Sequence, residues 1–127
     1  MDQIYSQNSL VSENKLNQGQ FLISPSRNYF ATLNQEGILL VYVSPHFCPA
    51  NIIFSSKLAG KGVPPFYLKC NNDGNLVIYD SKEISMWTTS TWGIGKAPYR
   101  LTIQDDGNLV LYDFSGKVIW SAECKRD

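Results

Sequence analysis

Short stretches in which apolar and polar residues alternate recur along this chain. One of them, "YRLTIQ" at residues 99–104, is followed by the turn-forming "DDG" at 105–107 and by "NLVLYD" at 108–113, which alternates again. Because successive side chains of a strand point to opposite faces, this pattern predicts a β-hairpin, with "VIWSAE" at 118–123 as the next strand. No stretch has convincing helical periodicity, so the chain is predicted to be all-β.

The hairpin belongs to a unit that the chain repeats. Residues 54–80 align with residues 87–113 without a gap at an offset of 33, and the seven-residue stretches 73–79 and 106–112 differ in one aliphatic side chain. Residues 27–43 align with the second copy at an offset of 37, because four extra residues lengthen their hairpin loop. A period of this length predicts a small, internally symmetric fold.

Alternation also assigns one face of each repeat to the core. We expect the three faces to pack around a pseudo-threefold axis, with further strands from residues 9–24, which contain a turn at Asn17 to Gly19. The predicted fold class is all-β, a prism of three four-stranded antiparallel sheets. The predicted domain is residues 1–127, with repeats at roughly 21–53, 54–86 and 87–120. The inward positions are Ala31, Leu33, Leu39, Val41 and Phe54, then Leu68, Cys70, Leu76, Ile78 and Trp87, then Leu101, Ile103, Leu109, Leu111 and Trp120.

Charge and composition narrow the class of partner. Eleven basic and eleven acidic residues cancel, so no overall field attracts nucleic acid or an anionic membrane surface. No apolar run approaches the about 20 residues of a membrane helix, so we expect no membrane insertion. The first 15 residues lack the basic and apolar regions of a secretory signal, and we expect a cytoplasmic protein or one exported by a non-classical route.

The cysteine count does not indicate a disulfide framework. Cys48, Cys70 and Cys124 are an odd number, and we expect free, buried thiols, although one Cys48–Cys70 bridge stays open as an alternative. Cys70 occupies the repeat position of Leu33 and Ile103, which indicates a core residue rather than a reactive one.

The outer face of the hairpin carries polar groups in a fixed order. Asp-Gly alone is explained by the turn, and Tyr and Val are good strand formers, so each residue has a purely structural interpretation. The turn does not need the amide before it or the phenol after it, however. Together the set offers a carboxylate, two amides, a phenol and a small apolar patch, which suits the hydroxyls and the C–H face of a sugar. The sets are Gln104, Asp106, Asn108, Val110 and Tyr112 in the third repeat, and Asn71, Asp73, Asn75, Val77 and Tyr79 in the second.

The spacing Gln-x-Asp-x-Asn-x-Val-x-Tyr at residues 104–112 resembles the signature of the monocot mannose-binding lectins, also called bulb-type or β-prism II lectins. The three-repeat layout and the recurring tryptophans extend this resemblance over nearly the whole chain. The resemblance implies binding of mannose or mannose-rich glycans by a non-enzymatic protein, without calcium or another cofactor. It implies that Asp106 and Asn108 hold the axial 2-hydroxyl, that Gln104 and Tyr112 hold the 3- and 4-hydroxyls, and that Val110 packs on the ring. It also implies homodimers formed by exchange of C-terminal strands.

The other two repeats depart from the motif. In the second, Asn71 replaces Gln and is one methylene shorter, so we rank this site below the third. In the first, Glu36 is longer than Asp and Ile38 removes the central amide, so we expect a site that is inactive or altered. The first-repeat positions are Asn34, Glu36, Ile38, Leu40 and Tyr42.

Other functions find less support. The rival hypothesis is a β-prism module that has lost most sugar binding and works through protein contacts. His46 and Cys48 make a weak metal motif, and the adjacent Asp105 and Asp106 lie in a turn rather than as a glycosidase pair. Trp92 replaces Ala59 of the preceding repeat. We expect it near the third motif, stacked on a ligand or packed between sheet edges.

Overall fold

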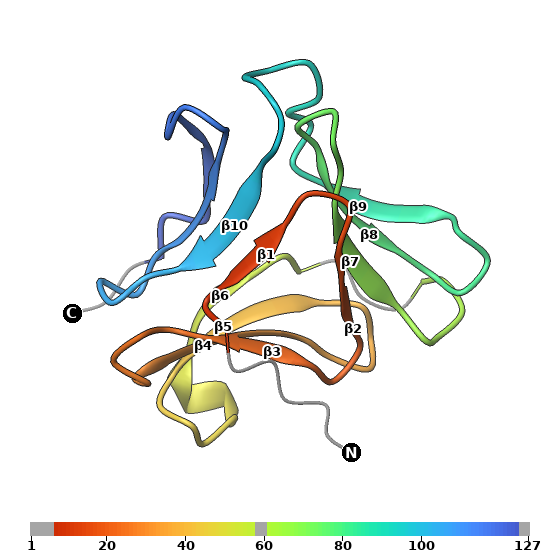
Figure 1. The fold of residues 1–127 in the computed structure, drawn as a ribbon. Helices are drawn as coiled ribbons and strands as arrows, with labels where there is room; N and C mark the ends of the chain where they lie inside the picture. Colours follow the sequence, from red (N-terminus) through yellow and green to blue (C-terminus); the bar gives the residue numbers. More distant parts are fainter. Residues whose placement is uncertain (1–6, 58–60, 125–127) are drawn as a thin grey trace.

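The structure, a computed structural model, describes residues 7–57 and 61–124. Within these residues the strands form three four-stranded antiparallel sheets, which stand as the sides of a prism (Figure 1). The all-β prediction and its three-sheet arrangement are confirmed. None of the helices described is long and apolar enough to cross a membrane. The elements are β1 (Ser9–Val11), β2 (Lys15–Asn17), β3 (Phe21–Ile23), β4 (Tyr29–Leu33), β5 (Leu39–Val43), the 3₁₀ helix η1 (Pro49–Asn51), β6 (Ile52–Ser55), β7 (Tyr67–Cys70), β8 (Leu76–Tyr79), β9 (Ser85–Thr88), β10 (Arg100–Ile103), β11 (Leu109–Tyr112) and β12 (Val118–Ser121).

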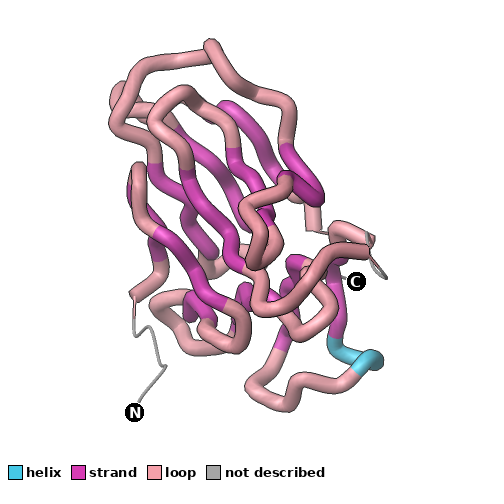
Figure 2. Tube along the Cα trace, turned by 90° about the vertical axis from the view of Figure 1, so that its right-hand side faces the viewer, coloured by secondary structure: helices cyan, strands magenta, loops and turns pink. Residues whose placement is uncertain are grey.

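Each sheet combines three consecutive strands with one strand of the N-terminal segment. The strand orders are β3-β4-β5-β6, β2-β7-β8-β9 and β1-β10-β11-β12. In Figure 1 the red β1 lies beside the blue β10, although the two are far apart in the sequence. Figure 2 shows the strands from the side, with the loops and turns at their ends. The first strands of the chain therefore join all three sheets and tie the repeats into one domain.

The inward faces of the sheets form one hydrophobic core. All fifteen inward positions predicted from alternation belong to it or pack against it. Phe54, Trp87 and Trp120 lie at equivalent places in β6, β9 and β12. Trp120 contacts both of the others edge to face, at centroid distances of 5.9 Å to Phe54 and 5.8 Å to Trp87. Such contacts add stability beyond the area they bury, so Trp120 links the three sheets.

A buried aspartate follows the motif tyrosine in the second and third repeats and holds the next turn in place. Asp113 Oδ1 accepts hydrogen bonds from the backbone N–H groups of Ser115 and Lys117, and from the Ser115 hydroxyl at 2.7 Å. Its Oδ2 accepts the Lys96 N–H at 3.1 Å, which fastens the preceding loop. These donors, the Ser115 hydroxyl above all, lower the pKa of Asp113 to about 2. Asp80 does the same for the second repeat.

The three cysteines are free of disulfides. Cys70 lies fully buried in the core, as its repeat position predicted, and burial raises the pKa of its thiol to about 12. Cys124 is half-buried, and burial likewise raises its pKa, to about 11. Cys48 is exposed, which corrects the expectation of a buried thiol: it lies in the long hairpin loop of the first repeat, which its two prolines keep outside the sheet.

Candidate functional site

The third motif is built on the hairpin of β10 and β11. Gln104 and Asp106 lie in the turn, and Asn108 precedes β11 on the face opposite the buried Leu109. The Nε2 of Gln104 donates a hydrogen bond to the hydroxyl of Tyr112, so the two ends of the motif meet. Because that hydroxyl accepts from Gln104, it keeps its own proton to donate to a ligand.

Asn108, the central amide, is held from three sides. Its Nδ2 donates to the Ser121 hydroxyl at 2.8 Å, and its Oδ1 accepts the N–H groups of Leu109 at 3.0 Å and Cys124 at 3.3 Å. Its backbone N–H donates to Asp106 Oδ1 at 2.9 Å, which leaves Oδ2 of that exposed carboxylate for a ligand. Ser121 was not among the predicted residues. Its place on β12, opposite Val110, follows from strand pairing and not from the motif spacing.

Val110 forms the floor of the site rather than a raised apolar patch. It is only 4% exposed, and it lies in register between Thr102 of β10 and Ser121 of β12. Beside it, the Arg100 guanidinium lies over the Tyr112 ring at 4.7 Å from its centroid, which fixes the ring on the outer face.

The second motif repeats this arrangement on β7 and β8. Despite its shorter side chain, the Asn71 Nδ2 reaches the Tyr79 hydroxyl at 3.2 Å, and the Asn75 N–H donates to Asp73 Oδ1 at 2.9 Å. Val77 is 3% exposed and again forms the floor. The structure therefore brings all five predicted residues of this motif together.

The central amide of the second motif has the opposite orientation. Asn75 Oδ1 accepts hydrogen bonds from the Thr88 hydroxyl at 2.6 Å, the Thr89 hydroxyl at 3.2 Å and the Thr91 N–H at 3.2 Å. Its Nδ2 is thus turned away from these three donors. The second motif offers amide hydrogens where the third uses one for Ser121.

The first motif does not form a comparable site. Asn34 Oδ1 accepts the N–H groups of Glu36 at 2.9 Å and Ile38 at 3.0 Å, so its side chain closes its own turn. Among the described residues, no side-chain amide donates a hydrogen bond to the Tyr42 hydroxyl, although Asn34 and Tyr42 line one cavity. Instead Phe47 of the long hairpin loop stacks on it, with centroids 4.7 Å apart. The repeat in which Ile38 replaces the central amide is thus also the repeat in which Phe47 stacks on the motif tyrosine.

Trp92 is exposed, and the residues on both sides of it are bonded to the second motif. The Gly93 N–H donates to the Asp73 carbonyl at 2.7 Å, and the Thr91 hydroxyl donates to the Gly74 carbonyl at the same distance. The sequence suggested the third motif because an offset of 33 compares equivalent positions. It does not say which hairpin a loop lies against.

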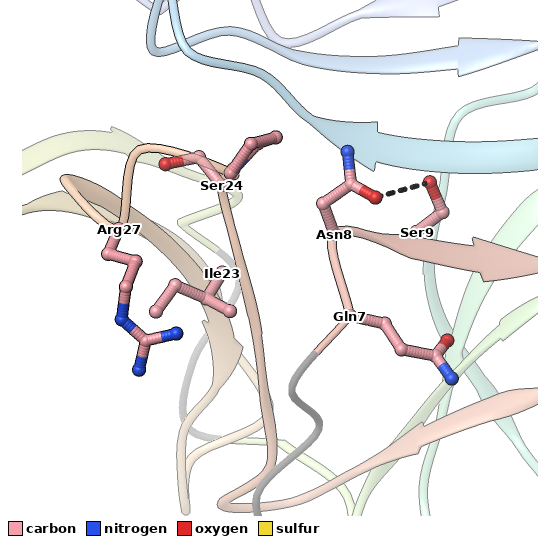
Figure 3. A pocket seen from close by; sticks show the side chains of 7 residues that line it. Gln7, Asn8, Ser9, Ile23, Ser24 and Arg27 are labelled. Atoms are coloured by element: carbon pink, nitrogen blue, oxygen red, sulfur yellow. Dashed lines mark hydrogen bonds between the residues drawn. The ribbon is translucent and has the colours of Figure 1, made fainter.

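A separate cavity of about 510 Å³ contains no residue of the three motifs. It lies where the start of β1 passes the turn after β3, with Asn8 and Ser9 on one side and Ser24 and Arg27 on the other (Figure 3). The described residues include no cluster of three or more His, Cys, Asp or Glu that could hold a metal ion. His46 and Cys48 both lie exposed in the long loop.

The second and third motifs share a chemical character. Each places one free carboxylate oxygen, two amides and a phenol around a small apolar floor, which can form many directional hydrogen bonds to hydroxyl groups. In each, a hydroxyl of the neighbouring strand bonds the central amide: the Thr88 hydroxyl donates to Asn75, and the Ser121 hydroxyl accepts from Asn108.

Several solved structures share this fold over nearly the whole chain. The Polygonatum cyrtonema lectin, complexed with monomannoside, is 31% identical, with a TM-score of 0.72 over 94% of this chain and 99% of that one. This chain belongs to the bulb-type, β-prism II lectin family. The Japanese Marasmius oreades lectin is 29% identical, with a TM-score of 0.80 over 95% of this chain and 94% of that one. A monomeric monocot mannose-binding lectin from Gastrodia elata is also 29% identical, with a TM-score of 0.79 over 92% and 97%.

Bulb-type lectins bind carbohydrate and are not enzymes, so the chain is a carbohydrate-binding lectin. No protein-family model matches the sequence, and no curated protein matches it either. Family membership therefore rests on the solved structures, together with the motif that the sequence carries.

Proposed function

We propose that this lectin binds mannose and mannose-rich glycans at its second and third motifs, without calcium. The observation that supports this most is the repeated geometry. In both motifs an amide donates to a phenol, Asn71 to Tyr79 and Gln104 to Tyr112, across a buried valine. A turn needs neither of these pairs, and their recurrence in two hairpins favours a ligand over a purely structural role.

The groups match a sugar with an axial hydroxyl. Asp106 Oδ2 can accept a hydrogen bond from an axial 2-hydroxyl, and the second amide hydrogen of Asn108 can donate one to it. Gln104 and Tyr112 are paired further along the same face and suit two adjacent equatorial hydroxyls. Because Asp106 is the charged acceptor of the set, it makes the strongest bond and fixes the orientation.

The names of the similar proteins agree with this assignment. The Polygonatum cyrtonema lectin was solved with a monomannoside, and the Gastrodia elata protein is called mannose-binding. No calcium is needed in the proposed contacts, because amides, a phenol and a carboxylate supply every bond themselves.

Multivalency would supply most of the useful affinity. A few hydrogen bonds to a small sugar largely replace bonds to water, so a single site binds weakly. Two sites on one rigid chain raise the avidity for branched glycans. A homodimer formed by exchange of C-terminal strands would carry twice as many sugar sites as one chain. Residues 125–127 of the segment involved lie outside the described part of the chain, and light scattering would measure the molecular mass.

A sugar titration tests the proposal. We expect wild type to bind methyl α-mannoside at two sites per chain, to ignore glucose, and to behave the same in a calcium chelator. Asn108→Ala should halve the number of sites, and Asn72→Ala, in the neighbouring turn but outside the motif, should change nothing. Folded protein that binds neither methyl α-mannoside nor a branched oligomannose would contradict the proposal and favour a protein-interaction module.

A further inference from the structure

Trp92 is the one tryptophan of this chain that the core does not use. Its side chain is 61% exposed, whereas Trp87 and Trp120 pack against the core and contact each other. An indole is a large apolar surface to leave in water, and exposed aromatic residues beside polar sites are frequent anchors for ligands. What lies next to Trp92 therefore decides what it can do.

The loop that carries Trp92 is fastened to the second motif on both sides of this residue. Before it, the Thr91 hydroxyl donates to the Gly74 carbonyl at 2.7 Å, and the Thr91 N–H donates to Asn75 Oδ1 at 3.2 Å. After it, the Gly93 N–H donates to the Asp73 carbonyl at 2.7 Å. Two motif residues, Asp73 and Asn75, and the glycine between them are thus bonded to the two neighbours of Trp92.

The fit between loop and turn leaves little room for movement. A Cβ atom on Gly74 would lie 2.9 Å from the Ile94 carbonyl oxygen and 3.0 Å from that of Thr91, so the turn needs glycine to let the loop approach. Gly74 also has a φ of +96°, which favours glycine. The backbone of Trp92 is consequently held at the rim of the second motif.

We propose that Trp92 forms an aromatic subsite that binds the sugar ring next to the mannose held by the second motif. The proposal rests on the proposed function, and it adds an oligosaccharide preference to one site. The C–H face of a pyranose can stack on an indole ring. This contact is favourable because it removes apolar surface of both the sugar and the ring from water. In the sequence alignment of the repeats, the positions equivalent to Trp92 are Ala59 and Lys125, both outside the described residues. Neither is aromatic, so we assign the subsite to the second motif alone.

The test isolates the second site in an Asn108→Ala background and compares methyl α-mannoside with α-linked mannobioses by calorimetry. We expect Trp92→Ala to lower the affinity for at least one mannobiose about fivefold, as expected for a few tens of Å² of apolar contact. The affinity for methyl α-mannoside should stay unchanged. Phe114→Ala is the matched control, because Phe114 is also a largely exposed aromatic residue, at 70%, on the turn after β11.

The outcomes separate this subsite from the function on which it rests. A mannobiose affinity that Trp92→Ala leaves unchanged, with methyl α-mannoside still bound, overturns the subsite and keeps the lectin site. Equal losses for Trp92→Ala and Phe114→Ala also overturn it. Failure of wild type to bind either sugar overturns the proposed function itself. As a second readout, the Trp92 indole N–H resonance should shift further with the preferred mannobiose than with methyl α-mannoside at saturation.

Discussion

Phe47 stacks on Tyr42, with ring centroids 4.7 Å apart and ring planes 10° apart. Phe47 also contacts Phe21 and Phe30 edge to face, so the long hairpin loop is anchored by an aromatic cluster on the outer face of the first sheet. In the other two repeats, the corresponding phenols are paired with an amide instead. The first repeat therefore has an aromatic stack at the position where the other two have an amide–phenol hydrogen bond.

Phe47→Ala should destabilise the fold without opening a third sugar site. Because Phe47 is 42% exposed, we expect a loss of about 1–2 kcal/mol in the free energy of unfolding, less than for a fully buried ring. The number of mannose sites should stay at two, since Ile38 still supplies no amide. Urea denaturation and calorimetric stoichiometry check both parts, and a third site would contradict this interpretation of the first repeat.

Asn71→Gln should strengthen the second site. Asn71 reaches Tyr79 at 3.2 Å, and its short side chain is thereby committed to the phenol. One more methylene lets the amide hold the phenol and a sugar hydroxyl together, and one added hydrogen bond corresponds to about threefold to tenfold in affinity.

Calorimetry in the Asn108→Ala background measures this change on the second site alone. Asn72→Gln is the control, because Asn72 is exposed in the same turn and lies outside the motif. An unchanged or weaker affinity for Asn71→Gln would show that the spacing at this position does not limit binding.

Asp113→Asn should make stability less sensitive to acid. The pKa of Asp113 is lowered to about 2 in the folded protein, from an ordinary value of 3.8, by the Ser115 hydroxyl and by backbone N–H donors. The ionised carboxylate thus favours the folded state at every pH above about 4, and this contribution disappears as the pH falls from about 4 to about 2. The variant should be less stable than wild type at neutral pH.

The difference between the two proteins should shrink as the pH falls through that window. Chemical denaturation at pH 7, 4, 3 and 2 measures it, with Glu36→Gln as a control. Glu36 is an exposed carboxylate in the turn between β4 and β5. A constant difference over this range would rule out a role for Asp113 ionisation.

Trp120→Ala should cost more stability than Trp87→Ala. Trp120 contacts both Phe54 and Trp87, whereas Trp87 has only the contact to Trp120 among the ring pairs of the described residues. We expect Trp120→Ala to lower the free energy of unfolding by about 3 kcal/mol and Trp87→Ala to lower it by about 2 kcal/mol. Trp92→Ala, on the surface, should stay within about 0.5 kcal/mol of wild type. Urea denaturation of the three variants gives the order, and equal losses for Trp87 and Trp120 would contradict it.

The core positions and the sugar-site motif of this lectin could be predicted from short stretches of its sequence. Strand alternation alone assigned Leu109 and Leu111 to the core, and the structure buries both completely. The repeated spacing from residue 104 to residue 112 pointed to the family that the solved structures show. Both are patterns of period two within one hairpin, where neighbours in sequence are also neighbours in space.

What the sequence left open depends on contacts between distant segments. Nothing local indicates that β1 pairs with β10, that Ser121 supports Asn108, or that Phe47 covers Tyr42. The same holds for Trp92, which alignment placed near the third motif and the folded loop places at Asp73. Alignment of the repeats shows which residues occupy equivalent positions. The packing of the sheets decides which loop contacts which hairpin. The sequence therefore determined the repeated unit and its chemistry, and the tertiary structure decided how the three copies differ.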